Sequence, residues 1–231
     1  MNTKRILVSW SGGKDSAMML WELQQSKTYE IAALVTTVTE GYERISMHGV
    51  RRELLIAQAE ALGIELCEVR IPKKASNDIY EMRMGEALQW YKKSGIDTIA
   101  FGDLFLADIR KYREAQLAKI GMHGIFPIWL QNTTELLKRF IDLKFKAFVC
   151  CIDPKVLDRS FTGSAIDESF AERLPSGVDP CGENGEFHSF VTDGPNFGKP
   201  VEVSIGEAVE REGFYFCDLL PIEHEEEITS P

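Results

Sequence analysis

Several features that define large classes of proteins are missing from this sequence of 231 residues. It has no uninterrupted apolar run of about 18 residues, which a membrane-spanning helix would need. Its first residues, Met1–Arg5, lack the apolar stretch and the small-residue cleavage site of a secretory signal. We therefore expect a soluble, cytoplasmic protein with no membrane partner.

The cysteines also lack the usual signs of a structural role. There are five of them, an odd number, and no Cys-x-x-Cys pair occurs, so neither a disulfide framework nor a four-thiolate metal site is indicated. Cys67, Cys150 and Cys151 fall in apolar runs and are expected to be buried. Cys181 lies in a glycine-rich segment and is the only cysteine at which the sequence suggests reactivity.

Positive charge is scarce as well. Acidic residues outnumber basic ones by 36 to 26, the formal net charge is −10, and the basic residues form no dense cluster. Proteins that bind nucleic acids usually present a basic surface to the phosphates. The charge therefore counts against a nucleic-acid partner, while the oligomeric state stays open, a homodimer included.

What the sequence does contain is a regular alternation of short apolar runs and helical patterns. The expected strands are Arg5–Trp10, Glu30–Val38, Glu65–Ile71, Asp97–Phe101, Ile125–Trp129 and Lys144–Ile152, and the expected helices are Lys14–Ser26, Val50–Leu62, Asp78–Lys93, Ala107–Ile120 and Asn132–Leu143. Asp78 with Glu81 has a capping-box pattern, and Asn132 can cap its own helix. Such alternation predicts parallel pairing through right-handed crossovers, hence an α/β fold with a doubly wound, mostly parallel five-stranded sheet.

After about residue 153 this rhythm stops. Glycine and proline become frequent between Pro175 and Pro200, and two short strands are expected at Pro200–Ile205 and Phe214–Leu220. We therefore expect a nucleotide-binding domain at residues 1–152 and a smaller α+β region that binds substrate at residues 153–231.

The strongest local pattern is Ser11-Gly12-Gly13-Lys14-Asp15-Ser16, between the first expected strand and the first helix. An open parallel sheet binds ligands at this position. Adjacent glycines let backbone N–H groups approach an anion, and the helix start and Lys14 add positive charge. A Walker A loop is excluded because Asp15 follows the lysine, and no Gly-x-Gly-x-x-Gly occurs. The pattern predicts a polyphosphate site of another kind.

This loop resembles the Ser-Gly-Gly-x-Asp-Ser loop of the N-type ATP pyrophosphatases, or PP-loop enzymes, which have an adenine-nucleotide alpha-hydrolase-like (HUP, Rossmann-like) fold. The resemblance implies that the loop holds the β- and γ-phosphates of ATP with Mg²⁺, and that attack at the α-phosphate yields AMP and pyrophosphate. It also implies that the adenine lies against the backbone after the second strand. The implied nucleotide-binding residues are Ser11, Gly12, Gly13, Lys14, Asp15, Ser16, Leu34, Val35, Thr36 and Gly102.

Gly102 and Asp103, at the end of the fourth expected strand, are a second candidate site. A carboxylate there could hold Mg²⁺ together with Asp15, or contact the substrate, across the crevice from the phosphate loop. The alternative is that Asp103 only caps a turn or helix. Of the charged residues on the following helix, Arg113 is expected to point inward.

A third candidate is the segment Cys181–Phe190, which carries Glu183, Glu186 and His188. Two carboxylates can bind an ammonium ion or an amine, and a histidine can move protons near neutral pH. The spacing fits no zinc pattern. The alternative is a solvated β-turn with no chemical role.

This segment is similar to the Gly-Glu-x-Gly-Glu stretch of the diphthine–ammonia ligase family, and with the other two sites the resemblance covers nearly the whole chain. It implies that ATP adenylates a substrate carboxylate and that ammonia, or glutamine-derived nitrogen, displaces AMP to form an amide. The catalytic residues would be Lys14, Asp103, Glu186 and His188, and the substrate-binding residues His48, Arg113, Glu183, Glu186 and His188.

The sequence departs from the family pattern at His188 and Asn184, and its stretch Ser46–Val50 resembles a bacterial branch. The acceptor is therefore left open between a protein-borne and a small-molecule carboxylate, including one in corrinoid (cobalamin) salvage. A PP-loop enzyme that modifies a tRNA base is a further alternative, against which the acidic charge counts. A non-catalytic nucleotide sensor is another, but it does not explain the Glu183–His188 cluster.

Overall fold

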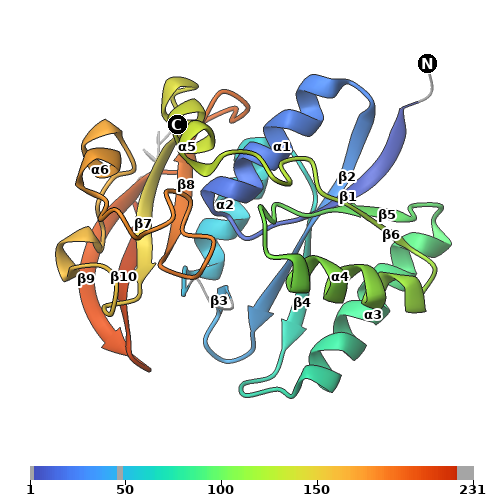
Figure 1. The fold of residues 1–231 in the computed structure, drawn as a ribbon. Coiled ribbons are helices and arrows are strands. Elements are labelled where there is room, and N and C mark those ends of the chain that lie inside the picture. Colours follow the sequence, from blue (N-terminus) through green and yellow to red (C-terminus); the bar gives the residue numbers. More distant parts are fainter. Residues whose placement is uncertain (1–2, 46–48, 223–231) are drawn as a thin grey trace, which may run out of the picture.

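The structure is a computed structural model that describes residues 3–45 and 49–222. Strands and helices alternate from the N-terminus to β6, as the sequence predicts, except that the two-residue strand β3 follows β2 directly (Figure 1). The elements are β1 (Lys4–Ser9), α1 (Lys14–Ser26), β2 (Tyr29–Thr39), β3 (Arg44–Ile45), α2 (Arg52–Leu62), β4 (Leu66–Ile71), α3 (Asn77–Lys93), β5 (Thr98–Ala100), α4 (Ala107–Lys119), β6 (His123–Ile125), α5 (Thr133–Asp142), β7 (Lys146–Ile152), the short 3₁₀ turn η1 (Arg159–Phe161), α6 (Glu168–Arg173), β8 (Phe187–Asp193), β9 (Val203–Arg211) and β10 (Phe214–Pro221).

The first sheet confirms the predicted doubly wound α/β architecture. Five parallel strands lie in the order β4, β2, β1, β5, β6, and β3 adds a two-residue antiparallel pairing to β2 beyond the end of β1. Ile6, Val8 and Leu34 belong to the core that α1 and α2 also bury, whereas Leu7 and Val35 belong to a second core on the side of α3 and α4. Strand residues alternate between the two cores because successive side chains point to opposite faces.

A second, antiparallel sheet has the strand order β8, β7, β10, β9. In Figure 1 it stands on the other side of α1 and α2 from the parallel sheet. Residues of this sheet share one hydrophobic core with α1 and α2. β7 lies within residues 1–152, yet it pairs with strands that follow residue 153, so the second sheet begins before the change in sequence pattern.

Three local expectations were wrong. The fifth parallel strand is His123–Ile125 instead of Ile125–Trp129, because the chain turns immediately afterwards around Pro127. α3 is capped by Ser76, whose hydroxyl accepts a hydrogen bond from the N–H of Ile79, and not by Asp78. β8 occupies Phe187–Asp193, where no strand was expected. By contrast, Asn132 does cap α5 by accepting from the N–H of Glu135.

None of the described helices is long and apolar enough to cross a membrane.

Candidate active site

The segment Ser11–Ser16, which is expected to bind phosphates and is called the phosphate loop below, forms a tight turn at the carboxyl end of β1. Gly12 has a φ of +77°, and a Cβ there would lie 2.7 Å from Oε1 of Gln58, so both backbone and space require glycine. The N-cap residue of α1 is Gly13, which has no side chain to cap the helix. The hydroxyls of Ser11 and Ser16 lie 3.2 Å apart beside this helix start. A helix N-terminus with adjoining hydroxyls is an arrangement that binds anions.

Lys14, the first residue of α1, is almost completely buried. Its Nζ donates to the two carboxylate oxygens of Asp15 at 2.9 and 2.8 Å, and also to the backbone carbonyl of Cys181. Burial lowers the pKa of Lys14, but the nearby Asp15, Cys181 and Asp179 together raise it, so that the net shift is upward and the ammonium stays charged. Lys14 therefore links the phosphate loop to the segment that contains Cys181.

Two residues that the sequence did not single out support the same loop. Gln58 of α2 is fully buried; its amide nitrogen donates to the carbonyls of Gly12 and Val191, and its oxygen accepts from Nε1 of Trp10. Ser189 of β8 accepts the backbone N–H of Lys14 at 3.1 Å. The sequence signal that could have identified Gln58 is its position, one turn after the core residue Leu54 on the apolar face of α2.

Asp103 lies where β5 ends, next to the phosphate loop. A Cβ on Gly102 would be 3.1 Å from the backbone of Asp15, so a glycine lets the end of β5 approach the start of α1. The Asp103 carboxylate accepts two hydrogen bonds from Arg113, at 2.6 Å from Nε and 3.0 Å from Nη2. The guanidinium lies 4.5 Å above the ring of Phe101. Arg113 thus points inward, as expected, and makes a bidentate ion pair.

Glu183 connects the segment Cys181–Phe190 to the residues that follow Asp103 at the carboxyl end of β5. Its Oε1 accepts the backbone N–H groups of Leu104, at 2.7 Å, and Phe105, at 3.4 Å. Burial raises the pKa of Glu183 to about 7, and the negative charges of Asp15 and Asp103 add to this rise while the hydrogen bonds oppose it. The three carboxylates that the sequence placed in separate motifs therefore share one electrostatic environment.

Glu186 and His188 are the other two candidate residues of the segment Cys181–Phe190. Glu186 is buried, and its carboxylate accepts hydrogen bonds from the backbone of Asp179 and Asn184 and from the Asn184 side chain. His188 lies on β8, and its burial and the charge of Lys14 lower its pKa to about 4. The imidazole is therefore neutral at pH 7. His48 lies outside the described residues.

The cysteines are all free thiols. Cys181 is buried, its thiol donates to the carbonyl of Thr133 at 3.4 Å, and burial raises its pKa. The expectation that Cys181 would be reactive is therefore wrong, because a reactive cysteine needs an accessible thiolate.

The stretch of β2 that is expected to bind the nucleotide holds a polar atom without a hydrogen-bond partner in the described part of the chain. Leu34, Val35 and Thr36 are all buried, and the Oγ1 of Thr36 makes no hydrogen bond within the described part of the chain. β1 pairs with β2 only as far as Val35, whose carbonyl accepts the N–H of Trp10 at 2.8 Å. Since a buried hydroxyl normally has a partner, Thr36 marks a place where a ligand could supply one.

Among residues 3–45 and 49–222, no three His, Cys, Asp or Glu side chains are grouped to hold a metal ion. Asp15 and Asp103 each contact a cationic side chain instead. Mg²⁺ is commonly held by one or two carboxylates together with the phosphates of the substrate. These two carboxylates therefore fit a magnesium ion that arrives with a nucleotide better than a resident one.

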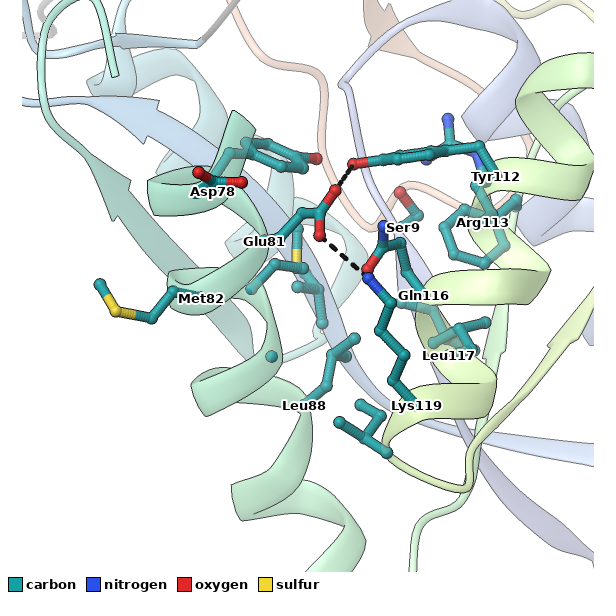
Figure 2. A pocket seen from close by; sticks show the side chains of 17 residues that line it. Ser9, Asp78, Glu81, Met82, Leu88, Tyr112, Arg113, Gln116, Leu117 and Lys119 are labelled. Atoms are coloured by element: carbon teal, nitrogen blue, oxygen red, sulfur yellow. Dashed lines mark hydrogen bonds and ion pairs between the residues drawn. The ribbon is translucent and has the colours of Figure 1, made fainter. Parts of the chain in front are cut away.

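An apolar cavity of about 350 Å³ lies beside the site, between α3 and α4 (Figure 2). Its apolar lining includes Val35, Leu88, Ile99, Phe101 and Leu117. The carboxylate of Glu81 on α3 accepts hydrogen bonds from Tyr112, at 3.0 Å, and Lys119, at 3.2 Å, both on α4, and so spans the space between the helices. Ser9 and Arg113 also line the cavity and connect it with the carboxyl edge of the sheet.

Comparison with known families agrees with this arrangement. The model of the diphthamide synthase N-terminal domain matches residues 4–124, and the model of the diphthamide synthase C-terminal domain matches residues 132–228. This chain belongs to the diphthamide synthase family. The phosphate loop, Asp103 and Arg113 lie in the first matched range, and Glu183, Glu186 and His188 lie in the second, so the site joins the two family domains.

Curated relatives of this diphthamide synthase family member share about a quarter of its residues. Diphthine–ammonia ligase of Mus musculus is 24% identical over 234 residues, which cover 89% of this chain and 85% of the relative. The enzyme of Homo sapiens is 24% identical over 230 residues, with the same coverage. That of Schizosaccharomyces pombe is 23% identical over 234 residues, or 93% of this chain and 38% of the longer relative.

Proposed function

We propose that this member of the diphthamide synthase family is an ATP-dependent ligase that converts a substrate carboxylate into an amide. The observation that carries the proposal is the Ser11–Ser16 turn at the start of α1, which contacts the segment of Glu183 through Lys14. The family match and the name of the curated relatives, diphthine–ammonia ligase, support ammonia as the second substrate. A protein-borne carboxylate such as diphthine is one acceptor that this name suggests.

The reaction proceeds in two steps. A carboxylate oxygen of the acceptor forms a bond to the α-phosphorus of ATP while the bond between that phosphorus and the pyrophosphate oxygen breaks. Ammonia then forms a bond to the carbonyl carbon, AMP leaves with the former carboxylate oxygen, and the nitrogen loses a proton. The products are an amide, AMP and pyrophosphate.

The described residues divide this work between them. Ser11, Ser16 and the start of α1 bind the β- and γ-phosphates, and Lys14 keeps a positive charge beside them. A magnesium ion held by the phosphates, Asp15 and Asp103 would neutralise charge on the leaving pyrophosphate. Glu183 has a pKa of about 7, which suits it to accept the proton that the nitrogen loses. Glu186 shapes the loop that presents Glu183, and His188 is an uncharged side chain whose pKa is lowered by burial and by the charge of Lys14.

The test is product analysis with ATP, Mg²⁺, ammonium and candidate carboxylic acids. We expect AMP and pyrophosphate, and not ADP and phosphate, as products. Lys14→Ala should lower the rate of AMP formation about 10²–10³-fold, the typical loss for one group that stabilises developing charge.

Lys93→Ala is the matched control, because Lys93 lies exposed at the end of α3, away from the loop. It should retain the wild-type rate, and circular dichroism should show both variants folded. Wild-type turnover in Lys14→Ala would refute the loop assignment. Nucleotide binding with no AMP under any condition would instead favour the sensor.

A further inference from the structure

The helix α3 buries few of its side chains for its length. Of its 17 residues only Leu88 and Tyr91 are buried, whereas α1, with 13 residues, buries seven. In Figure 1, α3 lies at the side of the molecule away from the antiparallel sheet. Most of the stability of a helix in a protein comes from packing an apolar face against a neighbour. The uncovered side of α3 therefore deserves comparison with a protein interface.

Three large apolar side chains lie on this uncovered side. Ile79 is 37% exposed, Met82 52% and Trp90 62%. Their spacing of three and then eight residues places them on one face of the helix, opposite to Leu88 and Tyr91. Figure 2 shows the Met82 side chain extending away from α4. Tryptophan and methionine are enriched in protein interfaces, and tryptophan is a frequent anchor there.

Two charged residues lie among these apolar side chains. Arg83 and Glu86 are both exposed, and their positions in the helix put them on the same face. Neither makes an ion pair with another residue in the ranges 3–45 and 49–222. The face therefore offers one charge of each sign, three positions apart, to a partner outside the chain.

We propose that the outer face of α3, formed by Ile79, Met82, Arg83, Glu86 and Trp90, binds the same face of a second copy of this chain, with the two helices antiparallel. The product is a symmetric homodimer. Its contact is isologous, so each interaction occurs twice.

The positions of the charges select both the second copy and the antiparallel direction. If the twofold axis crosses the helix pair between positions 84 and 85, Arg83 lies opposite Glu86 of the second copy and Glu86 lies opposite its Arg83. Ile79 and Trp90 of the two copies meet in the same register, again twice. In a parallel pair about a twofold axis, each charge would instead face its own like charge. The face is thus complementary to itself in one direction only.

This dimer leaves both candidate sites open. α3 follows β4, so it begins at the carboxyl edge of the parallel sheet and runs away from that edge. Two antiparallel copies of α3 therefore direct their carboxyl edges, where the phosphate loops lie, to opposite sides. No residue of one copy enters the site of the other, and the dimer would form whether or not the chain is a ligase.

Sedimentation velocity of the full chain with a reducing agent tests the proposal. One helix from each copy makes a small interface, so we expect a dimer fraction that rises between about 1 and 100 µM. Trp90→Glu should weaken the dimer at least about tenfold, because it charges the apolar anchor. Val156→Glu is the matched control, because it changes an exposed apolar residue that follows β7, and it should dimerise as the wild type does. Circular dichroism verifies folding, and Trp90→Gln replaces Trp90→Glu if the latter does not fold.

A charge exchange is a sharper test, which only self-association passes. Arg83→Glu and Glu86→Arg should each weaken the dimer about tenfold, because both ion pairs become contacts of like charge. The double variant R83E/E86R restores two pairs of opposite charge, so its dissociation constant should return to within about threefold of the wild type. An equimolar mixture of the two single variants should also dimerise, since every pair in the mixed dimer has opposite charges.

Four results would overturn the proposal: a wild-type chain that stays monomeric at about 100 µM, Trp90→Glu dimerising like Val156→Glu, single charge variants that dimerise like the wild type, or a double variant no better than the single ones. The last result would mean that the outer face of α3 meets a surface other than its own.

Discussion

Replacing Glu183 by glutamine should make this protein more stable in alkaline solution and leave it unchanged in acid. The substitution keeps a side-chain oxygen that can accept the N–H groups of Leu104 and Phe105, but it removes the charge. The folded protein raises the pKa of Glu183 from 4.5 to about 7. A carboxyl group with a raised pKa binds its proton more tightly in the folded state, so its contribution is fully favourable below about pH 4.5 and is lost as the pH rises through 7.

The size of the effect follows from the same pKa. Each unit corresponds to about 1.4 kcal/mol, and partial solvent screening of this half-buried group reduces the total to about 1–2 kcal/mol. Urea denaturation at pH 5 and pH 8 measures it as the difference in unfolding free energy between Glu183→Gln and wild type. Glu60→Gln, an exposed carboxylate on α2, controls for the removal of one negative charge from an acidic protein. The reasoning would be refuted by equal differences in unfolding free energy at pH 5 and pH 8, or by a difference at pH 8 that is no larger than that of Glu60→Gln.

Three further predictions concern stability. Gln58→Leu should cost about 2–4 kcal/mol in urea denaturation, because it leaves the buried carbonyls of Gly12 and Val191 without a donor; a cost below 1 kcal/mol would contradict this. Gly85→Ala should add about 0.5–1 kcal/mol, since the new methyl group meets open space inside a helix, and a decrease would show strain that the structure does not contain. Asp218→Asn should cost about 1 kcal/mol at pH 7, and the cost should disappear as the pH falls below about 2. The arginines bonded to Asp218 lower its pKa to about 2, so its contribution is present above pH 4 and disappears as the pH falls through 2; a pH-independent cost would oppose this account.

The sequence alone determined the elements whose signals are local. The Ser11–Ser16 loop, the alternation of strands and helices up to β6 and the cap at Asn132 were all predicted, because a turn, a helix face or a cap depends on residues a few positions apart. The errors were local too. Ser76 competes with Asp78 for the same helix start, and the chain around Pro127 leaves the strand that was predicted to contain it.

Only the tertiary structure decided which of these motifs meet. β8 was not predicted because its partner strand β7 is remote in sequence, and its pairing depends on hydrogen bonds formed after the chain folds. Glu183 contacts Leu104 from 79 positions away, and Gln58 reaches Val191 from 133 positions away. No pattern along the chain encodes such pairs, because the burial that makes them favourable exists only once both sheets enclose α1 and α2.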